Sequence, residues 1–160
     1  MSSDVTLDVR NLRTQFFTKA GLVKAVDDVS FHVKAGEVMG LVGESGSGKT
    51  VTGFSILGLV DPPGEVVSGE ILFKGQQIAR ADDGTMQGLR GGSIAMIFQD
   101  PMMTLNPVLR IDTQMMEAIL AHRQVPKSVA RQEARDMLGR VGIPSPDERL
   151  KEYPHQLSGG

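Results

Sequence analysis

Hydrophobic and polar residues alternate along the first part of the chain, with the period of a strand that has one buried face. The segments VTLDVRNL (5–12) and VKAVDDVSFHV (23–33) both follow this pattern. Turn-forming residues at 19–21 and 34–37 bound them, and a short apolar run occupies 38–42. The pattern therefore predicts three strands, at 5–12, 23–33 and 38–42.

The pattern changes after the third predicted strand. Residues 49–60 fit a helix, which Asp-Pro-Pro-Gly at 61–64 should stop. Residues 68–78 and 93–99 resemble strands on either side of a polar stretch, 79–92, and from Ile111 onward the apolar spacing is helical. We expect a β-rich part, 1–100, with one early helix, followed by a helical part, 101–160.

Composition narrows the functional classes. The 160 residues include 17 basic and 19 acidic side chains, giving a net charge of −2. This balance argues against a nucleic-acid-binding face, which needs a basic field. The absence of cysteine excludes disulfides and thiolate zinc sites. The N-terminal residues do not resemble a signal peptide, and the apolar runs are too short to cross a bilayer.

The segment GESGSGKT at 43–50 carries the clearest chemistry, because it matches the phosphate-loop pattern G-x-x-x-x-G-K-[ST]. Its glycines let backbone N–H groups converge on phosphate oxygens, Lys49 supplies a cation and Thr50 offers a hydroxyl to Mg²⁺. Val51 occupies the place where a dinucleotide fingerprint needs its last glycine. The candidate nucleotide-binding residues are Gly43, Glu44, Ser45, Gly46, Ser47, Gly48, Lys49 and Thr50.

A second motif, LSGG, ends the chain at 157–160. A serine hydroxyl next to glycine amides can bind an anion, although the same residues also suit a plain turn. The order of GESGSGKT, a strand ending in Gln99, a helical segment and LSGG resembles the ATP-binding subunits of ABC transporters. FQDPMMTLNP (98–107) and YPHQLSGG (153–160) resemble the branch that imports dipeptides, oligopeptides, glutathione or nickel.

The resemblance implies an α/β fold of the P-loop NTPase class, with an antiparallel β subdomain and a helical subdomain, incomplete at the C-terminus. It implies that Gln99 senses Mg²⁺ and the attacking water, so Gln99 is the candidate catalytic residue and, with Thr50, a metal residue. Phe16 would stack on the adenine of ATP, with Phe17 as the alternative. Residues Ser158, Gly159 and Gly160 would contact the γ-phosphate held by an opposite subunit.

The resemblance also implies partners. They are a second ATP-binding subunit, identical or a sister, integral membrane permease subunits and, indirectly, a solute-binding protein; nucleic acid is not among them. The protein would lie peripherally on the cytoplasmic face of the cell (inner) membrane. Met102, Met103 and Leu105 would be apolar contacts to the permease.

Several expected parts of an ATPase are missing from the sequence. The metal-holding aspartate, the residue that orients water and the switch histidine follow the signature motif in this family, so we expect a truncated chain whose segment 38–44 is incompletely covered. Asp100 could instead be the metal aspartate of a stand-alone kinase or GTPase. A soluble ABC-type ATPase of DNA repair or translation is a further alternative, and the imported solute stays open.

Overall fold

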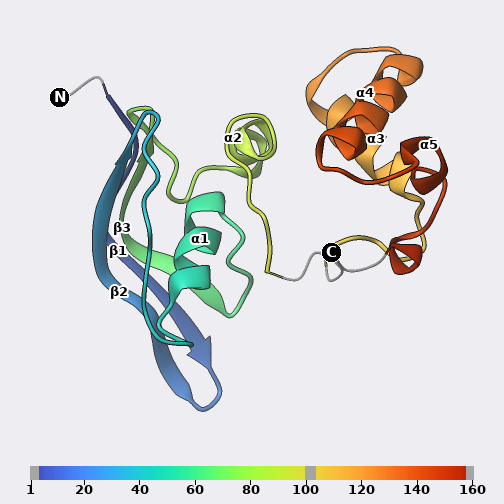
Figure 1. Ribbon diagram of the computed structural model, residues 1–160. Helices are drawn as coiled ribbons and strands as arrows, with labels where there is room; N and C mark the ends of the chain where they lie inside the picture. The colour runs from blue at the N-terminus through green and yellow to red at the C-terminus, as the bar shows by residue number, and fades with distance from the viewer. Residues whose placement is uncertain (1–3, 100–103, 158–160) are drawn as a thin grey trace. The chain divides into compact units, whose positions relative to one another are not determined.

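The computed structural model describes residues 4–99 and 104–157 (Figure 1). The chain divides into two compact units, Met1–Arg90 and Gly91–Gly160. The first combines a sheet with helices, and the second is helical. In the described ranges, no helix is long and apolar enough to cross a membrane.

The first unit contains a four-stranded antiparallel sheet, with strands in the order β2-β1-β3-β4. Val9, Leu12 and Ile71 are almost fully buried in it. The first hairpin is longer than predicted because its two strands stay paired as far as Thr18 and Gly21. The bounds are β1 Val5–Thr18, β2 Gly21–Lys34, β3 Gly64–Phe73 and β4 Gln76–Gln77.

Helix α1 (Lys49–Leu57) contacts β1 and β2. It ends earlier than predicted because Gly58 takes the left-handed conformation, with φ 61°, and its N–H donates to the last turn. A polar contact joins helix and sheet: the buried hydroxyls of Thr14 and Ser55 lie 2.7 Å apart. Because Ser55 donates its proton to the carbonyl of Val51 at 2.7 Å, Thr14 is the donor to Ser55.

A second helix, α2 (Asp83–Leu89), lies in the polar stretch for which no helix was predicted. Asp82 caps it by accepting hydrogen bonds from the Thr85 amide at 3.0 Å and the Thr85 hydroxyl at 2.6 Å. These bonds lower the pKa of Asp82 below its ordinary value. The spacing of an acidic N-cap and a threonine three residues later was the available sequence signal.

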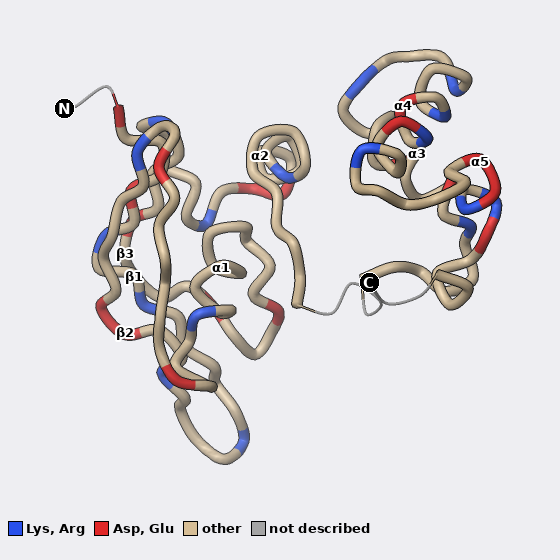
Figure 2. Tube along the Cα trace, in the orientation of Figure 1, with Lys and Arg blue, Asp and Glu red and all other residues tan. Residues whose placement is uncertain are grey.

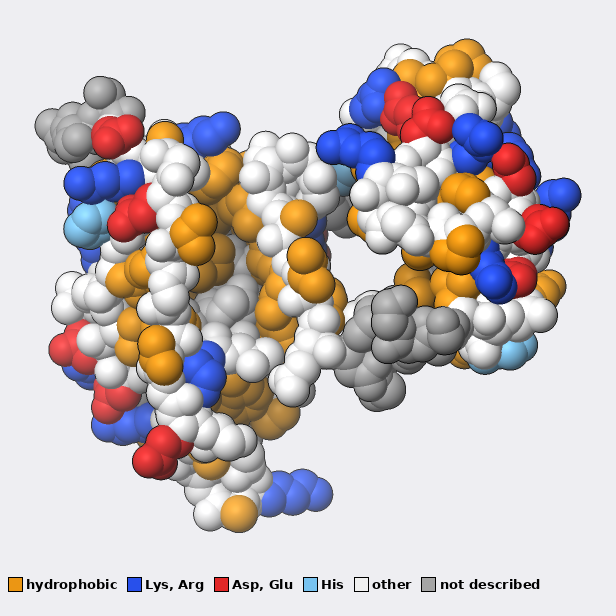
Figure 3. Space-filling model, viewed as in Figure 1, with side chains coloured by type: hydrophobic (Ala, Val, Ile, Leu, Met, Phe, Trp, Pro, Cys, Tyr) orange, Lys and Arg blue, Asp and Glu red, His pale blue; other side chains and the backbone are white. Residues whose placement is uncertain are grey.

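Two of the strand predictions are wrong. Residues 38–42 and 93–99 form no strand in the described structure. Val38 is 97% exposed, Val42 92% and Ile97 96%. An apolar run becomes a strand only where a neighbour supplies a hydrogen-bond ladder, and the described residues supply none to either run. The predicted exposure of 38–44 is present, and Figure 3 shows hydrophobic side chains at the surface of the first unit.

The second unit packs α3 (Ile111–His122) against α4 (Lys127–Arg140). Helix α5 (Pro146–Arg149) and a 3₁₀ turn, η2 (Pro154–Gln156), follow. Its core consists of Ile111, Ala134, Leu138 and Leu150. Charges of both signs are interspersed along α4 and α5 (Figure 2). The helical pattern predicted from Ile111 is thus confirmed.

One ion-pair cluster fixes the start of α3. The Asp112 carboxylate, with its side chain 10% exposed, accepts from Arg110 at 2.6 Å and from Arg131 of α4 at 2.8 Å. A nearly buried carboxylate that pairs with two guanidinium groups ties the two helices together.

Candidate phosphate-binding site

The glycine-rich segment 43–48 leads directly into α1, with Gly46 at φ 80° and Gly48 at φ 87°. Gly48 is the N-cap of the nine-residue helix, no side chain caps it and its first turn holds no acidic residue. The first amides of a helix lack intrahelical acceptors and carry the positive end of the helix dipole. The arrangement is therefore suited to an anion such as phosphate.

Gly48 approaches the backbone of β2 closely. The pairing of β1 with β2 skips Ala25, since Thr14 pairs with Val26 while Gln15 pairs with Lys24. Ala25 is thus an extra residue in β2, a bulge, and a Cβ added to Gly48 would lie only 2.1 Å from the Ala25 oxygen. Only glycine fits this contact, which seats the end of the phosphate loop on the sheet.

Lys49 closes the loop on itself. Its ammonium donates to the carbonyl oxygens of Gly43 at 2.7 Å and Glu44 at 2.6 Å. The third bond, to the Ser47 hydroxyl, is longer at 3.3 Å. An ammonium has three protons, so two hold the loop in shape and the weakly engaged third is the one that a phosphate oxygen can take.

The two threonines of this turn differ in their surroundings. Thr50 is exposed, whereas Thr52 is 4% exposed and donates to the carbonyl of Gly48 at 2.9 Å. In the described ranges, no group of three or more His, Asp or Glu side chains could hold a metal ion. A hydroxyl is a suitable oxygen ligand for Mg²⁺, which usually binds through one or two protein groups together with substrate phosphates and water. Thr50 fits that chemistry.

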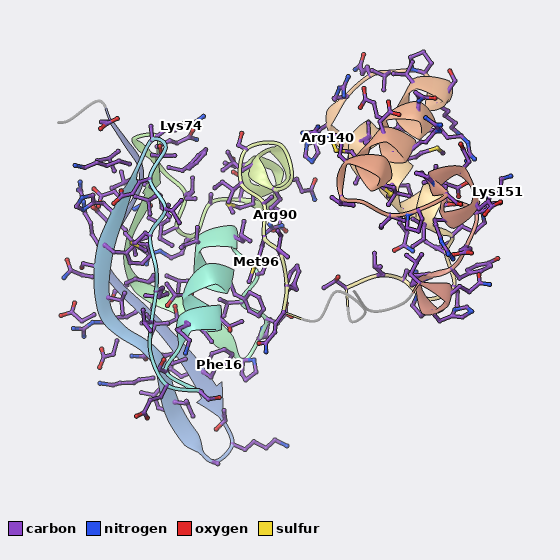
Figure 4. All side chains as sticks on the ribbon, viewed as in Figure 1. Phe16, Lys74, Arg90, Met96, Arg140 and Lys151 are labelled. Carbon is purple, nitrogen blue, oxygen red and sulfur yellow. The ribbon has the colours of Figure 1, made fainter. Side chains whose placement is uncertain are left out.

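Phe16 lies on the side of β1 that faces α1, because it follows two residues after Thr14, which bonds to that helix. Its ring packs closely on Gly64: a Cβ added there would lie 2.5 Å from the ring. Phe17 points to the other side and is 52% exposed. Figure 4 labels Phe16 near the lower part of the first unit. Phe16 thus packs against the protein and Phe17 is exposed, and the contact of either ring with adenine stays a prediction.

The remaining candidates belong to the second unit or lie outside the described residues. Gln99 is exposed and belongs to the second unit, so its role toward the loop stays a prediction. Outside the described residues lie Ser158, Gly159 and Gly160, as well as Asp100, Met102 and Met103.

Leu105, expected as an apolar contact to the permease, is partly buried and packs against the core of the helical unit, so its contact with a permease stays a prediction. Among the described residues of this loop, Val108 is an exposed hydrophobic side chain, at 75%. The Gln114 side chain holds the loop: it accepts from the Asn106 amide at 2.9 Å and donates to the carbonyls of Asn106 and Leu109, both at 3.0 Å. Val108 is therefore exposed on a loop whose backbone is held by hydrogen bonds to Gln114.

Sequence reasoning missed three positioning groups. Thr14 and Gly64 support α1 and Phe16, and Arg90 reaches back from the end of α2 to the end of α1. No sequence pattern indicates the roles of Thr14 and Arg90, since their partners lie far along the chain. The sequence pattern predicts a turn at Gly64. The structure adds a second reason for glycine there, because any side chain at this position would collide with the Phe16 ring.

Comparison with known proteins shows the family of the chain. The profile of the ABC transporter family matches residues 26–160, so the chain belongs to that family. The chain is 52% identical over 155 residues to the dipeptide transport ATP-binding protein DppD of Bacillus subtilis (strain 168), covering 96% of this chain and 46% of the relative. It is 43% identical over 155 residues to the oligopeptide transport ATP-binding protein OppD of the same organism, covering 96% and 43%.

Solved structures show the same fold. The dimeric post-hydrolysis state of the ATP-binding cassette MJ0796, bound to ADP and Pi, matches with a TM-score of 0.82 and 22% identity, covering 96% of this chain and 63% of that chain. CbiO1 of Clostridium perfringens, part of the ABC transporter complex cbiONQ, matches with a TM-score of 0.67 and 24% identity, covering 98% and 57%. The fold class predicted from the sequence is confirmed. The chain spans about half the length of its curated relatives.

Proposed function

We propose that this chain forms the nucleotide-binding part of a subunit that hydrolyses ATP to power the import of peptides, or of a related solute, through an ABC transporter. The observation that carries the proposal is the loop 43–50, whose helix N-terminus is uncapped and whose lysine has one weakly engaged proton. The identity to dipeptide and oligopeptide transport proteins supports peptides as the cargo.

The chain's own residues contribute binding and orientation. Loop amides and Lys49 would hold the β- and γ-phosphates, and the Thr50 hydroxyl would hold Mg²⁺, which supplies charge neutralisation when bound. Gln99 would orient the water that attacks the γ-phosphate, since its amide can both donate and accept. Phe16 would fix the adenine. Catalysis then rests on positioning and charge stabilisation.

Assembly completes the proposal. Ser158 and its glycines would face the nucleotide of a second ATP-binding subunit, so that two subunits enclose two ATP molecules. The dimeric state of the cassette MJ0796 supports this arrangement. The subunit would lie on the cytoplasmic face of the membrane and dock to permease subunits through Val108 and the loop that Gln114 braces. A separate solute-binding protein would deliver the cargo.

A substitution of Lys49 tests the nucleotide site. Lys49→Ala removes a charged donor worth about 1.5–3 kcal/mol, so the Kd for ATP should rise about 10- to 150-fold. Binding is measured by fluorescence titration of the full-length protein with a labelled ATP analogue. Lys19→Ala, in the exposed turn of the first hairpin, is the control with the same loss of charge. An unchanged affinity in Lys49→Ala would refute the proposed function.

A further inference from the structure

Two contacts hold helix α1 against the first hairpin, and all the residues involved belong to the first unit. At the start of the helix, Gly48 lies against the backbone of Ala25, the bulge residue of β2. Seven residues further on, the Ser55 hydroxyl lies 2.7 Å from that of Thr14 in β1. Seven residues span about 10 Å of helix, so the two contacts fix the direction of α1 as well as its position.

The contact between Thr14 and Ser55 is a buried chain of hydroxyls. Thr14 is 0% exposed and Ser55 is 3% exposed. Thr14 donates to Ser55, and Ser55 donates to the Val51 carbonyl within the helix at 2.7 Å. A buried hydroxyl that loses its partner is costly, so α1 cannot turn or slide along β1 without a penalty. A helix held only at Gly48 would be free to pivot about that point.

The Phe16 ring has its own fixed place on the same hairpin. It follows two residues after Thr14, on the same face of β1. The ring and Val60 both pack on Gly64, because a Cβ added to Gly64 would lie 2.5 Å from the ring and 2.8 Å from Val60. The ring is thus placed by the sheet, whereas the amides that begin α1 are placed by the direction of that helix. The hydroxyl pair joins these two parts of the site.

We propose that Thr14 and Ser55 are positioning residues: they set the spacing between the Phe16 ring and the phosphate-binding end of α1, and so make the site select a nucleoside triphosphate over a phosphate chain without a base. This inference rests on the proposed function, in which Phe16 contacts adenine and the loop 43–50 holds the phosphates. A ligand with both groups gains from the second contact only when the two places are correctly spaced. Tripolyphosphate uses the loop alone, so its affinity does not depend on that spacing.

The test compares the Kd for ATP with the Kd for inorganic tripolyphosphate, both measured with Mg²⁺ by calorimetric titration of the full-length protein. Thr14→Val removes the hydroxyl and keeps the shape of the side chain, and valine suits a strand. We expect Thr14→Val to raise the Kd for ATP about fivefold or more while the Kd for tripolyphosphate stays within about twofold. Ser55→Ala should have the same effect. The double variant should lose no more than either single variant, because all three lack the same hydrogen bond.

Two further variants serve as controls. Thr14→Ser keeps the hydroxyl and should retain the wild-type ratio of the two Kd values. Thr85→Val removes a hydroxyl of the same unit whose bond to Asp82, at 2.6 Å, serves α2, so it should leave both Kd values unchanged.

The outcomes separate this inference from the proposed function. A wild-type ratio of the two Kd values in Thr14→Val refutes the inference, whether both values are unchanged or both rise together; in the second case the hydroxyl pair only stabilises the fold. If Thr14→Val does not fold, the same ratio in Ser55→Ala decides. A wild type that binds tripolyphosphate as tightly as ATP also refutes the inference. A wild type that binds neither ligand would instead overturn the proposed function.

Discussion

Gly48 gives the sharpest prediction, because the structure offers matched glycines elsewhere. Gly48→Ala would place a Cβ 2.1 Å from the Ala25 oxygen, at a residue with φ 87°. Gly46 (φ 80°) and Gly36 (φ 73°) have similar backbone angles, and nothing lies within 4 Å of a Cβ added to either. The three substitutions therefore share the backbone penalty, and only Gly48→Ala adds a steric conflict.

The magnitudes follow from those two terms. A left-handed conformation costs a residue with a Cβ about 1–2 kcal/mol. Alanine restores about 0.4–1 kcal/mol by restricting the unfolded chain. Gly36→Ala and Gly46→Ala should thus destabilise the fold by about 1 kcal/mol. Overpacking adds about 1–3 kcal/mol at Gly48, which gives a total of about 2–4 kcal/mol.

Two measurements on the full-length protein check this expectation. Denaturant unfolding compares the free energy of unfolding of Gly48→Ala with that of Gly36→Ala. Titration with ATP compares the same two variants. The protein can also relieve the steric conflict at Gly48 by shifting the loop, and this should cost about 5- to 150-fold in ATP affinity. Equal stability together with equal affinity in Gly48→Ala and Gly36→Ala would show that the loop does not rest on the β2 bulge.

Two further predictions concern docking and pH. Val108→Asp should abolish copurification with the permease subunits while the affinity for ATP is kept. Val141 is similarly exposed, at 73%, so Val141→Asp is the control and should leave copurification intact. Equal copurification of both variants would argue against docking through this loop. Hydrogen bonds from the hydroxyl and amide of Thr85 hold the pKa of Asp82 below its ordinary value of 3.8. The stability that this carboxylate contributes is therefore present above pH 3.8 and is lost as the pH falls through the folded-state pKa. Asp82→Asn still caps α2 but cannot titrate, so its thermal midpoint should fall less than that of the wild type between about pH 5 and pH 3, and identical pH curves would contradict this assignment.

Local patterns sufficed for the elements whose partners are near in sequence. The first hairpin, the phosphate loop with its helix, and the helices from Ile111 onward were all predictable, because turn residues, glycine spacing and helical periodicity act over a few residues. The motif at 43–50 also indicated the chemistry of the candidate site, since its glycines, its lysine and its threonine each suit a role toward a bound phosphate and its metal. The resemblance carried by the longer motifs then predicted the family.

Other features were decided only by the packing of distant segments. The apolar runs at 38–42 and 93–99 have strand-like composition, yet pairing requires a neighbouring strand that composition does not reveal. Leu105 packs, partly buried, against the core of the helical unit, whereas Val108 in the same loop is exposed. Two contacts join residues that are far apart in sequence: Gly48 lies against the Ala25 bulge, and Arg90 donates to the end of α1. The periodicity of a sequence indicates which face of a helix or strand is buried, whereas the tertiary structure determines which residues that face contacts.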